Sequence, residues 1–455
     1  MTCPAIIVAA ILSSVSPQLH TLTATQNVWD VAAADMNGNG NKDILLLTND
    51  ETAFPPHKEV ALFLADEQCA YPPRATLRLV LPNEVGAVIL AETDGAPPVE
   101  LIALHAGGAY LYRYTDDGFH LCEQVEFHSL LPSRSREPVF MHNGAKDLRR
   151  DGIDEWLIPT ADGLEIRTRE GLVAAVSCDV VSEMRRSDSV VIVHRLPDYQ
   201  TFELEAESTL GIAFLSDEFA DFAYGDNWAK RRQFRIPMNL EEKWDASAKM
   251  GDITGNGFPD LVVTQTRGTV RMESETHVYL ASEPFVYPET PNASFTSSGA
   301  VSSPVILDVN NNGRLDLVFI RIPFGVKNIV NFFVRGKLSV RSDVYLFDGD
   351  RYGDSSDYST SMTMDAPEGR QRVAYTFGDF NGDGLADVAY GRSEKQFNIY
   401  TGDAKRFVSS RPWQSFELPS FGSAAPHDLN GNSAMDIILF RPGGDLATRV
   451  DVIVF

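Results

Sequence analysis

One nine-residue pattern recurs along this chain of 455 residues. Each copy begins with Asp, has Asn or Thr at its third position and Asn or Asp at its fifth, and ends with a second Asp before an apolar run. The clear copies begin at Asp35, Asp252, Asp308, Asp379 and Asp428. Because Asn, Asp and Gly favour tight turns, each copy predicts a short loop that leads into a strand.

Weaker copies extend the repeat over nearly the whole chain. "DLRRDGIDEWLIP" begins at Asp147, "ETDGAPPVELIAL" begins at Glu92, and residues 190–204 keep the hydrophobic rhythm without the loop. Together these segments make eight units of roughly 50 to 70 residues, a period that indicates a propeller or a solenoid. The sixth unit is longer than the others and contains an insertion.

Each unit is typical of β-structure, because short apolar or alternating runs are separated by Gly, Pro, Asn and Asp. The first unit contains four such runs, at residues 28–35, 42–48, 60–65 and 75–81. Four strands per unit is the arrangement of a propeller blade. We therefore predict an all-β fold, a β-propeller of seven or eight four-stranded blades, with eight preferred.

The two ends of the repeat region favour a closed ring. The last unit stops one strand short, whereas residues 18–26 form a strand-like segment ahead of the first unit. This segment could supply the missing outer strand. The propeller would then form one domain over residues 18–455. Residues 1–17 are then surplus to the ring, and the apolar run at 4–16 is either a signal peptide or an ordinary buried strand. A signal peptide would place the protein in an extracellular, periplasmic or cell-surface location.

The charge of the chain narrows the possible partners. The formal net charge is −24, which argues against nucleic-acid binding, because a nucleic-acid binder needs a basic surface. No apolar run reaches the length of a transmembrane helix.

The loops suit Ca²⁺, which prefers oxygen ligands from carboxylates, carboxamides and backbone carbonyls. The candidate metal ligands are the side chains at positions 1, 3, 5 and 9. They are Asp35, Asn37, Asn39 and Asp43; Asp252, Thr254, Asn256 and Asp260; Asp308, Asn310, Asn312 and Asp316; Asp379, Asn381, Asp383 and Asp387; and Asp428, Asn430, Asn432 and Asp436. A turn without metal is the alternative. An EF-hand is excluded because position 12 is apolar and strands flank the loops.

The motif "D-x-N-x-D-G-x-x-D" followed by an apolar strand resembles the FG-GAP/VCBS repeats of the integrin alpha-subunit propeller and its bacterial relatives. The resemblance implies a β-propeller with a structural calcium ion in a hairpin loop of each competent blade, at most five here. Three departures stand out: Arg149 at position 3 of the third unit, Ala96 at position 5 of the second, and Ser433 in place of glycine in the last.

The expected function is that of a binding or adhesion-type module for a protein or glycan, without catalysis. A carbohydrate-active enzyme, such as a polysaccharide lyase or hydrolase, and a structural scaffold of an envelope assembly are the alternatives. Two segments that combine basic and aromatic residues, 227–235 and 321–343, could present a surface to a partner. Packing on a neighbouring blade is the alternative interpretation of both.

Overall fold

The structure is a computed structural model. It describes residues 16–50, 52–131, 137–186, 190–237, 244–268, 273–298, 300–301, 303–323, 331–332, 334–367 and 371–455. The segment expected to be a signal peptide lies outside these residues except for Ser16 and Pro17.

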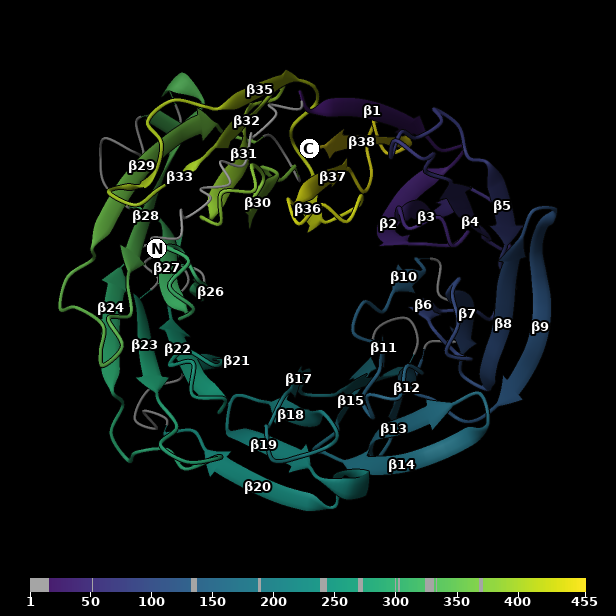
Figure 1. Ribbon diagram of the computed structural model, residues 1–455, viewed down its shortest axis with the longest axis horizontal. Helices are drawn as coiled ribbons and strands as arrows, with labels where there is room; N and C mark the ends of the chain where they lie inside the picture. The colour runs from purple at the N-terminus through teal and green to yellow at the C-terminus, as the bar shows by residue number, and fades with distance from the viewer. Residues whose placement is uncertain are drawn as a thin grey trace, which may run out of the picture.

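Eight small antiparallel sheets surround a central axis and form a closed β-propeller (Figure 1). This confirms the predicted fold class and the preferred number of blades. In each blade the chain starts at the inner strand and moves outward. The strands of blades one to four are β2 (Asn27–Ala34), β3 (Asp43–Asp50), β4 (His57–Phe63) and β5 (Leu77–Val80); β6 (Ala87–Ala91), β7 (Glu100–His105), β8 (Gly108–Thr115) and β9 (Gly118–Glu126); β11 (Ala145–Lys146), β12 (Glu155–Thr160), β13 (Gly163–Thr168) and β14 (Gly171–Ser177); and β17 (Asp198–Phe202), β18 (Gly211–Leu215), β19 (Phe219–Tyr224) and β20 (Lys230–Arg235).

Blades five to eight follow the same order. Their strands are β21 (Asp245–Gly251), β22 (Asp260–Arg267), β23 (Glu273–Tyr279) and β24 (Ala293–Ser298); β26 (Val305–Leu307), β27 (Asp316–Ile322), β28 (Lys337–Tyr345) and β29 (Tyr358–Asp365); β30 (Tyr375–Gly378), β31 (Asp387–Ser393), β32 (Gln396–Tyr400) and β35 (Gln414–Glu417); and β36 (Ser423–His427), β37 (Asp436–Phe440) and β38 (Arg449–Val454). Short additions are β10 (Val139–Phe140), parallel to β6; β25 (Ala300–Val301), paired with β27; and the β33 (Gly402–Asp403)–β34 (Phe407–Val408) hairpin of blade seven.

The ring closes through the N-terminal strand, as the sequence predicts. β1 (Gln18–Thr23) pairs antiparallel with β38, from Gln18 opposite Val454 to Thr23 opposite Arg449. It thereby becomes the outer strand of blade eight, and its Leu22 side chain is fully buried. Closure therefore joins the first and last parts of the repeat region.

The hydrophobic core is divided among the interfaces between neighbouring blades. The second strand of each blade is buried on both faces, so consecutive residues contribute to different interfaces. In β3, Ile44 and Leu46 pack against blade eight, whereas Leu45 and Leu47 pack against blade two. This two-sided burial explains why the residues after each loop form a continuous apolar run rather than an alternating one.

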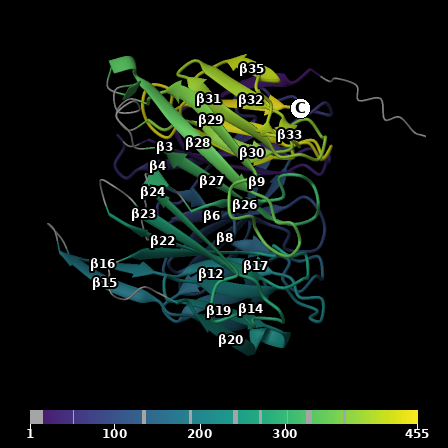
Figure 2. The same cartoon turned by 90° about the vertical axis from the view of Figure 1, so that its left-hand side faces the viewer.

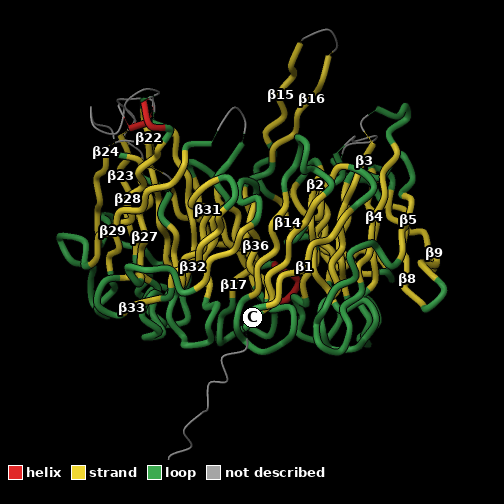
Figure 3. Tube along the Cα trace, turned by 90° about the horizontal axis from the view of Figure 1, so that it is seen from above, coloured by secondary structure: helices red, strands yellow, loops and turns green. Residues whose placement is uncertain are grey.

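One hairpin lies outside the ring. β15 (Val181–Arg186) and β16 (Val190–Arg195) pair only with each other among the described strands. They join blade three to blade four and project beyond one face of the propeller (Figures 2 and 3). The fourth unit, expected over residues 190–204, therefore enters its blade only at β17.

Candidate functional site

The five clear copies of the pattern form equivalent loops, here called D loops: residues 35–43, 252–260, 308–316, 379–387 and 428–436. Each joins the inner strand of a blade to its second strand. Since the strands are antiparallel, all five lie on one face, opposite the β15–β16 hairpin (Figure 3). They belong to blades one, five, six, seven and eight, which are consecutive because blade eight adjoins blade one.

The D loop of blade seven shows how the polar side chains hold the turn. The Asp379 carboxylate accepts hydrogen bonds from the backbone N–H groups of Gly382 (2.7 Å), Asp383 (3.1 Å) and Gly384 (2.7 Å). Asn381 Oδ1 accepts from the N–H of Asp383 at 2.9 Å, and Asp383 Oδ1 accepts from the N–H of Leu385 at 2.8 Å. Gly384 has φ +83°, a conformation that favours glycine.

The other four D loops repeat this arrangement. In each, the N–H at position 6 donates to the carboxylate at position 1, and the side-chain oxygen at position 5 accepts from the N–H at position 7. The position 6 bonds are Gly40 to Asp35 (2.8 Å), Gly257 to Asp252 (2.8 Å), Gly313 to Asp308 (2.7 Å) and Ser433 to Asp428 (3.2 Å). The local sequence thus determines the turn through bonds within the loop.

The Asp at position 9 is fully buried in all five loops. One of its carboxylate oxygens accepts from the N–H at position 2, and the other accepts from an N–H just beyond the third strand of the same blade. For Asp387 these donors are Phe380 at 2.8 Å and Gly402 at 2.6 Å. In the other four loops, the N–H groups beyond the third strand belong to Ala65, Ala281, Phe347 and Phe455. Position 9 therefore fastens the loop to its blade.

Burial makes ionisation of these carboxyl groups unfavourable. It raises the pKa of Asp387 to about 7 and the pKa values of Asp43, Asp260, Asp316 and Asp436 to about 6. The backbone N–H bonds act in the opposite direction but are the smaller influence.

Hydrogen bonds link neighbouring D loops into a chain. The N–H at position 8 of one loop donates to the carbonyl at position 1 or 2 of the loop in the preceding blade. The four bonds are Leu315 to Ile253 (3.2 Å), Ala386 to Val309 (3.5 Å), Met435 to Asp379 (2.7 Å) and Lys42 to Leu429 (2.7 Å). The chain runs through blades five, six, seven, eight and one.

Three predicted ligand oxygens are buried without a hydrogen-bond partner in the described part of the chain: Thr254 Oγ1, Asn310 Oδ1 and Asp428 Oδ1. They stand at positions 3, 3 and 1 of three different D loops. An unsatisfied buried oxygen costs about 1–3 kcal/mol, and a bound cation would remove that cost. The loop residues therefore fit a calcium ion. No cluster of three His, Cys, Asp or Glu side chains suited to a metal occurs among the described residues. Carboxamides and carbonyls, with the hydroxyl of Thr254 in one loop, would therefore have to complete the sites.

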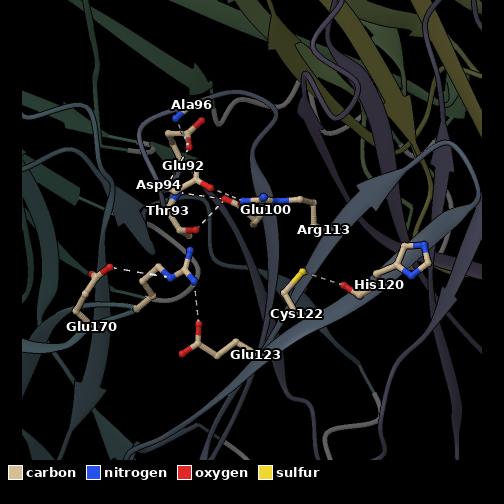
Figure 4. A network of polar contacts seen from close by, with 11 residues as sticks. Glu92, Thr93, Asp94, Ala96, Glu100, Arg113, His120, Cys122, Glu123 and Glu170 are labelled. Atoms are coloured by element: carbon tan, nitrogen blue, oxygen red, sulfur yellow. Dashed lines mark hydrogen bonds and ion pairs between the residues drawn. The ribbon is translucent and has the colours of Figure 1, made fainter.

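The weaker copy in blade two contains an arginine from outside the loop. Arg113, on β8, donates from Nε to Glu100 Oε1 at 2.9 Å and from Nη2 to Asp94 Oδ2 at 2.5 Å (Figure 4). Glu100 is position 9 of this copy and Asp94 is position 3. Sequence reasoning missed Arg113 because it lies beyond the nine-residue pattern.

The weaker copy in blade three contains an arginine within the loop. Arg149 Nε donates to Glu155 Oε1 at 2.5 Å, and its Nη2 lies 3.3 Å from Asp151 Oδ2. Glu155 is fully buried. Burial raises the pKa of Glu155, and the hydrogen bond to Glu155 raises the pKa of Arg149.

The two segments that combine basic and aromatic residues are largely occupied by internal contacts. Trp228 is buried, and its Nε1 donates to the carbonyl of Leu210 at 2.8 Å, so this ring is not available to a partner. In segment 321–343, Arg321 and Arg341 each pair with Asp343 at 2.8 Å. Residues 324–330 and 333 of that segment lie outside the described residues.

Comparison with protein families identifies the repeat. A model of the FG-GAP-like repeat matches residues 252–319 and 379–439, which contain four of the five D loops. The ring is thus a β-propeller that contains FG-GAP-like repeats. No curated protein matches the sequence of this propeller.

Solved structures similar to this FG-GAP propeller share little sequence with it. They include BBS1N in complex with ARL6DN (7% identity, 95% of this chain and 94% of that chain, TM-score 0.39). A WD40 domain of Toxoplasma gondii coronin has 9% identity over 96% and 86% of the two chains, TM-score 0.36. Rhamnogalacturonan lyase YesW has 10% identity over 94% of this chain and 68% of that chain, with a TM-score of 0.32. Likenesses at this level carry no argument about function. Within the described residues, no helix has the length and hydropathy needed to cross a membrane.

Proposed function

We propose that this FG-GAP propeller is an exported protein whose five D loops bind calcium and whose ring serves as a binding or adhesion-type module, without catalysis. The observation that carries the calcium assignment is the set of unpaired buried oxygens, Thr254 Oγ1, Asn310 Oδ1 and Asp428 Oδ1. All three occur at predicted ligand positions.

The residues that would hold calcium are those at positions 1, 3, 5 and 9. In four of the loops each position 9 oxygen accepts one N–H, which leaves a second acceptor direction on each; Asp260 Oδ2 accepts two, from Ile253 and Thr254. A calcium ion offers charge neutralisation to a loop that contains up to three carboxylates, as in Asp379, Asp383 and Asp387. Its role would be structural, because it would hold the inner hairpin of each blade in one conformation.

The β15–β16 hairpin supports the binding role. Met184 and Ile192 are cross-strand neighbours and are 62% and 56% exposed. A lone two-stranded hairpin is marginally stable in water, and its outer edges carry no strand among the described residues. It offers an apolar pair and free edges to a protein or glycan on the face opposite the D loops.

A thermal melt with excess calcium and with a chelator tests the metal assignment. A ligand that binds only the native state stabilises it by about 2.7 kcal/mol per site at 100 times its Kd. We expect a large rise in Tm that depends on calcium concentration. An unchanged Tm would mean that the D loops are turns only.

The binding role is tested in the same buffer by glycan arrays and by measured affinity for any protein partner. The protein is compared with the double variant Met184→Ser, Ile192→Ser, which leaves the ring intact. We expect binding that the double variant loses. Release of sugar products by the unmodified protein would instead favour the carbohydrate-active alternative.

A further inference from the structure

We propose that the loops of blades two and three are cation sites of the D-loop type that are filled by an arginine of the protein itself, Arg113 in one and Arg149 in the other. The inference rests on the proposed calcium function of the D loops. Two sites are thereby added to the five D loops. Their arginines would prevent metal binding in the wild-type protein.

The loop of blade three has the D-loop backbone. Asp147, at position 1, accepts from the N–H groups at positions 5 and 6, both at 3.0 Å. Asp151, at position 5, accepts from the N–H at position 7 at 3.1 Å. Glu155, at position 9, accepts from the N–H at position 2 at 2.8 Å. These bonds match those at the same positions in the D loop of blade seven.

The guanidinium of Arg149 lies among the ligand positions of that loop. It contacts the carboxylates at positions 5 and 9, two of the four positions expected to bind metal. In the D loops, the outer oxygen of position 9 accepts an N–H that follows the third strand. In blade three the outer oxygen of Glu155 accepts Arg149 instead.

In the loop of blade two an arginine also contacts the loop carboxylates, but this arginine lies outside the loop. Its arginine comes from β8, yet the guanidinium bridges positions 3 and 9, Asp94 and Glu100. The backbone bonds from position 2 to Glu100 (3.1 Å) and from position 5 to Glu92 (3.0 Å) are retained. In both loops position 9 is Glu, one methylene longer than Asp, which extends the carboxylate toward the guanidinium.

A guanidinium and a divalent cation repel each other and compete for the same carboxylates. Arg113 and Arg149 therefore compete with calcium for the carboxylates that these loops retain, Asp94 and Glu100 in blade two and Asp151 and Glu155 in blade three. In blade three the arginine is the main departure from the pattern, because Asp147, Asp151, Gly152 and Glu155 already occupy positions 1, 5, 6 and 9.

The test is the variant Arg149→Asn, which supplies the position 3 carboxamide present in four of the D loops. Calcium stoichiometry is measured by equilibrium dialysis with ⁴⁵Ca²⁺ on the full chain. We expect one more bound Ca²⁺ per chain than in wild type, and a larger rise in Tm on adding calcium. Arg113→Ala, which uncovers Asp94 and Glu100, should also gain one ion.

Arg78→Ala is the matched control. Arg78 Nε lies 3.8 Å from Glu59 Oε1, and Glu59 is buried, so this variant also removes an arginine beside a buried carboxylate, but outside any loop of this type. It should gain no calcium. An added ion in Arg78→Ala would overturn the assignment, because arginine removal anywhere would then have the same effect.

The outcomes separate this inference from the proposed function. Wild-type protein that binds calcium, together with loop variants that bind no more, overturns the inference alone. Wild-type protein without calcium, together with variants that bind one ion, overturns the proposed function but supports the inference. If Arg149→Asn does not fold, Arg113→Ala decides the question, and Arg149→Lys should fold with the wild-type stoichiometry because it keeps the positive charge.

Discussion

The loops between the first and second strands differ between two arcs of the ring in the groups that contact their carboxylates. In blades five, six, seven, eight and one, the D loops contain no arginine at positions 1, 3, 5 or 9, and hydrogen bonds link each loop to the next. In blades two and three, an arginine contacts the loop carboxylates. Under the proposed calcium assignment, the first arc would take its positive charge from bound ions, whereas the second arc takes it from arginine side chains.

Hydrogen bonds between loops couple neighbouring blades within each arc. The D loops of blades six, seven, eight and one donate from position 8 to the loop of the preceding blade, so ordering one loop orders an acceptor for its neighbour. Blades two and three share a similar bond, from the N–H of Asp154 to the carbonyl of Glu92 at 2.8 Å. We therefore expect calcium to act on the first arc as a unit and to leave the second arc nearly unchanged.

Calcium removal should produce the largest effect. With a chelator, we expect backbone amides in residues 252–319, 375–440 and 27–50 to exchange faster with solvent, while those in residues 87–126 and 155–177 keep their protection. Hydrogen–deuterium exchange measured by mass spectrometry, with and without calcium, checks this. Uniform loss of protection around the ring would contradict the division into two arcs.

Asp379→Ala should produce the next largest effect, because the substitution removes a carboxylate ligand and the acceptor of three N–H groups. We expect a loss of about 2.7 kcal/mol in the calcium-dependent part of the unfolding free energy at saturating calcium. The metal-free protein should also lose about 1–3 kcal/mol. Urea unfolding with calcium and with chelator separates the two parts.

Arg149→Ala is the control from the other arc. It should lower stability in both buffers, because Glu155 is left buried without its arginine. It should raise rather than lower the calcium-dependent difference, because the guanidinium that competes for Asp151 and Glu155 is gone. Equal losses of the calcium-dependent part in Asp379→Ala and Arg149→Ala would show that the two loops do not differ as proposed.

The buried position 9 residues make the stability of the protein depend on pH. The folded-state pKa of Asp387 is about 7, above the ordinary value of about 3.9, so the native state binds the extra proton. In chelator, this contribution to stability is fully present below about pH 4 and is lost as pH rises through 7.

Calcium favours the ionised carboxylate, so the stabilisation by calcium should grow from pH 5 to pH 8. The slope should be on the order of 1 kcal/mol per pH unit for each fully coupled group. Unfolding free energies measured in both buffers across this range check it. A stabilisation by calcium that decreases as pH rises would contradict the proposal that the position 9 carboxylate is a calcium ligand.

The sequence alone was sufficient for most of the fold. Local patterns indicated the blades, the D loops and the closing strand at residues 18–26, because turn residues and apolar runs act over a few positions. The protruding hairpin was missed, since β16 has the same apolar composition as a blade strand and only its pairing with β15 separates it from the ring.

The site was predictable only in part, for a similar reason. The side chains at positions 1, 3 and 5 act within the loop, so their spacing reveals them. Arg113 reaches Asp94 and Glu100 through the pairing of β7 with β8, which no local motif encodes. The buried fastening role of position 9 was also hidden, because its second donor lies just beyond a strand that the loop pattern does not include.

Ser433→Gly should produce the smallest effect and tests the D loop that departs most from the others. Ser433 stands at position 6 with φ +71°, where the other four D loops have glycine. A non-glycine residue in this conformation costs about 1–2 kcal/mol, and part of the gain on substitution is offset by the greater freedom of glycine in the unfolded chain. We expect a net gain of up to about 1 kcal/mol in chelator and in calcium alike, measured by urea unfolding. The matched reverse change, Gly313→Ser in blade six, should lose a similar amount, because Gly313 adopts φ +78° in the equivalent turn and a Cβ there would meet no atom within 4 Å. A gain from Ser433→Gly only in the presence of calcium would instead mean that the serine weakens metal binding rather than the turn itself.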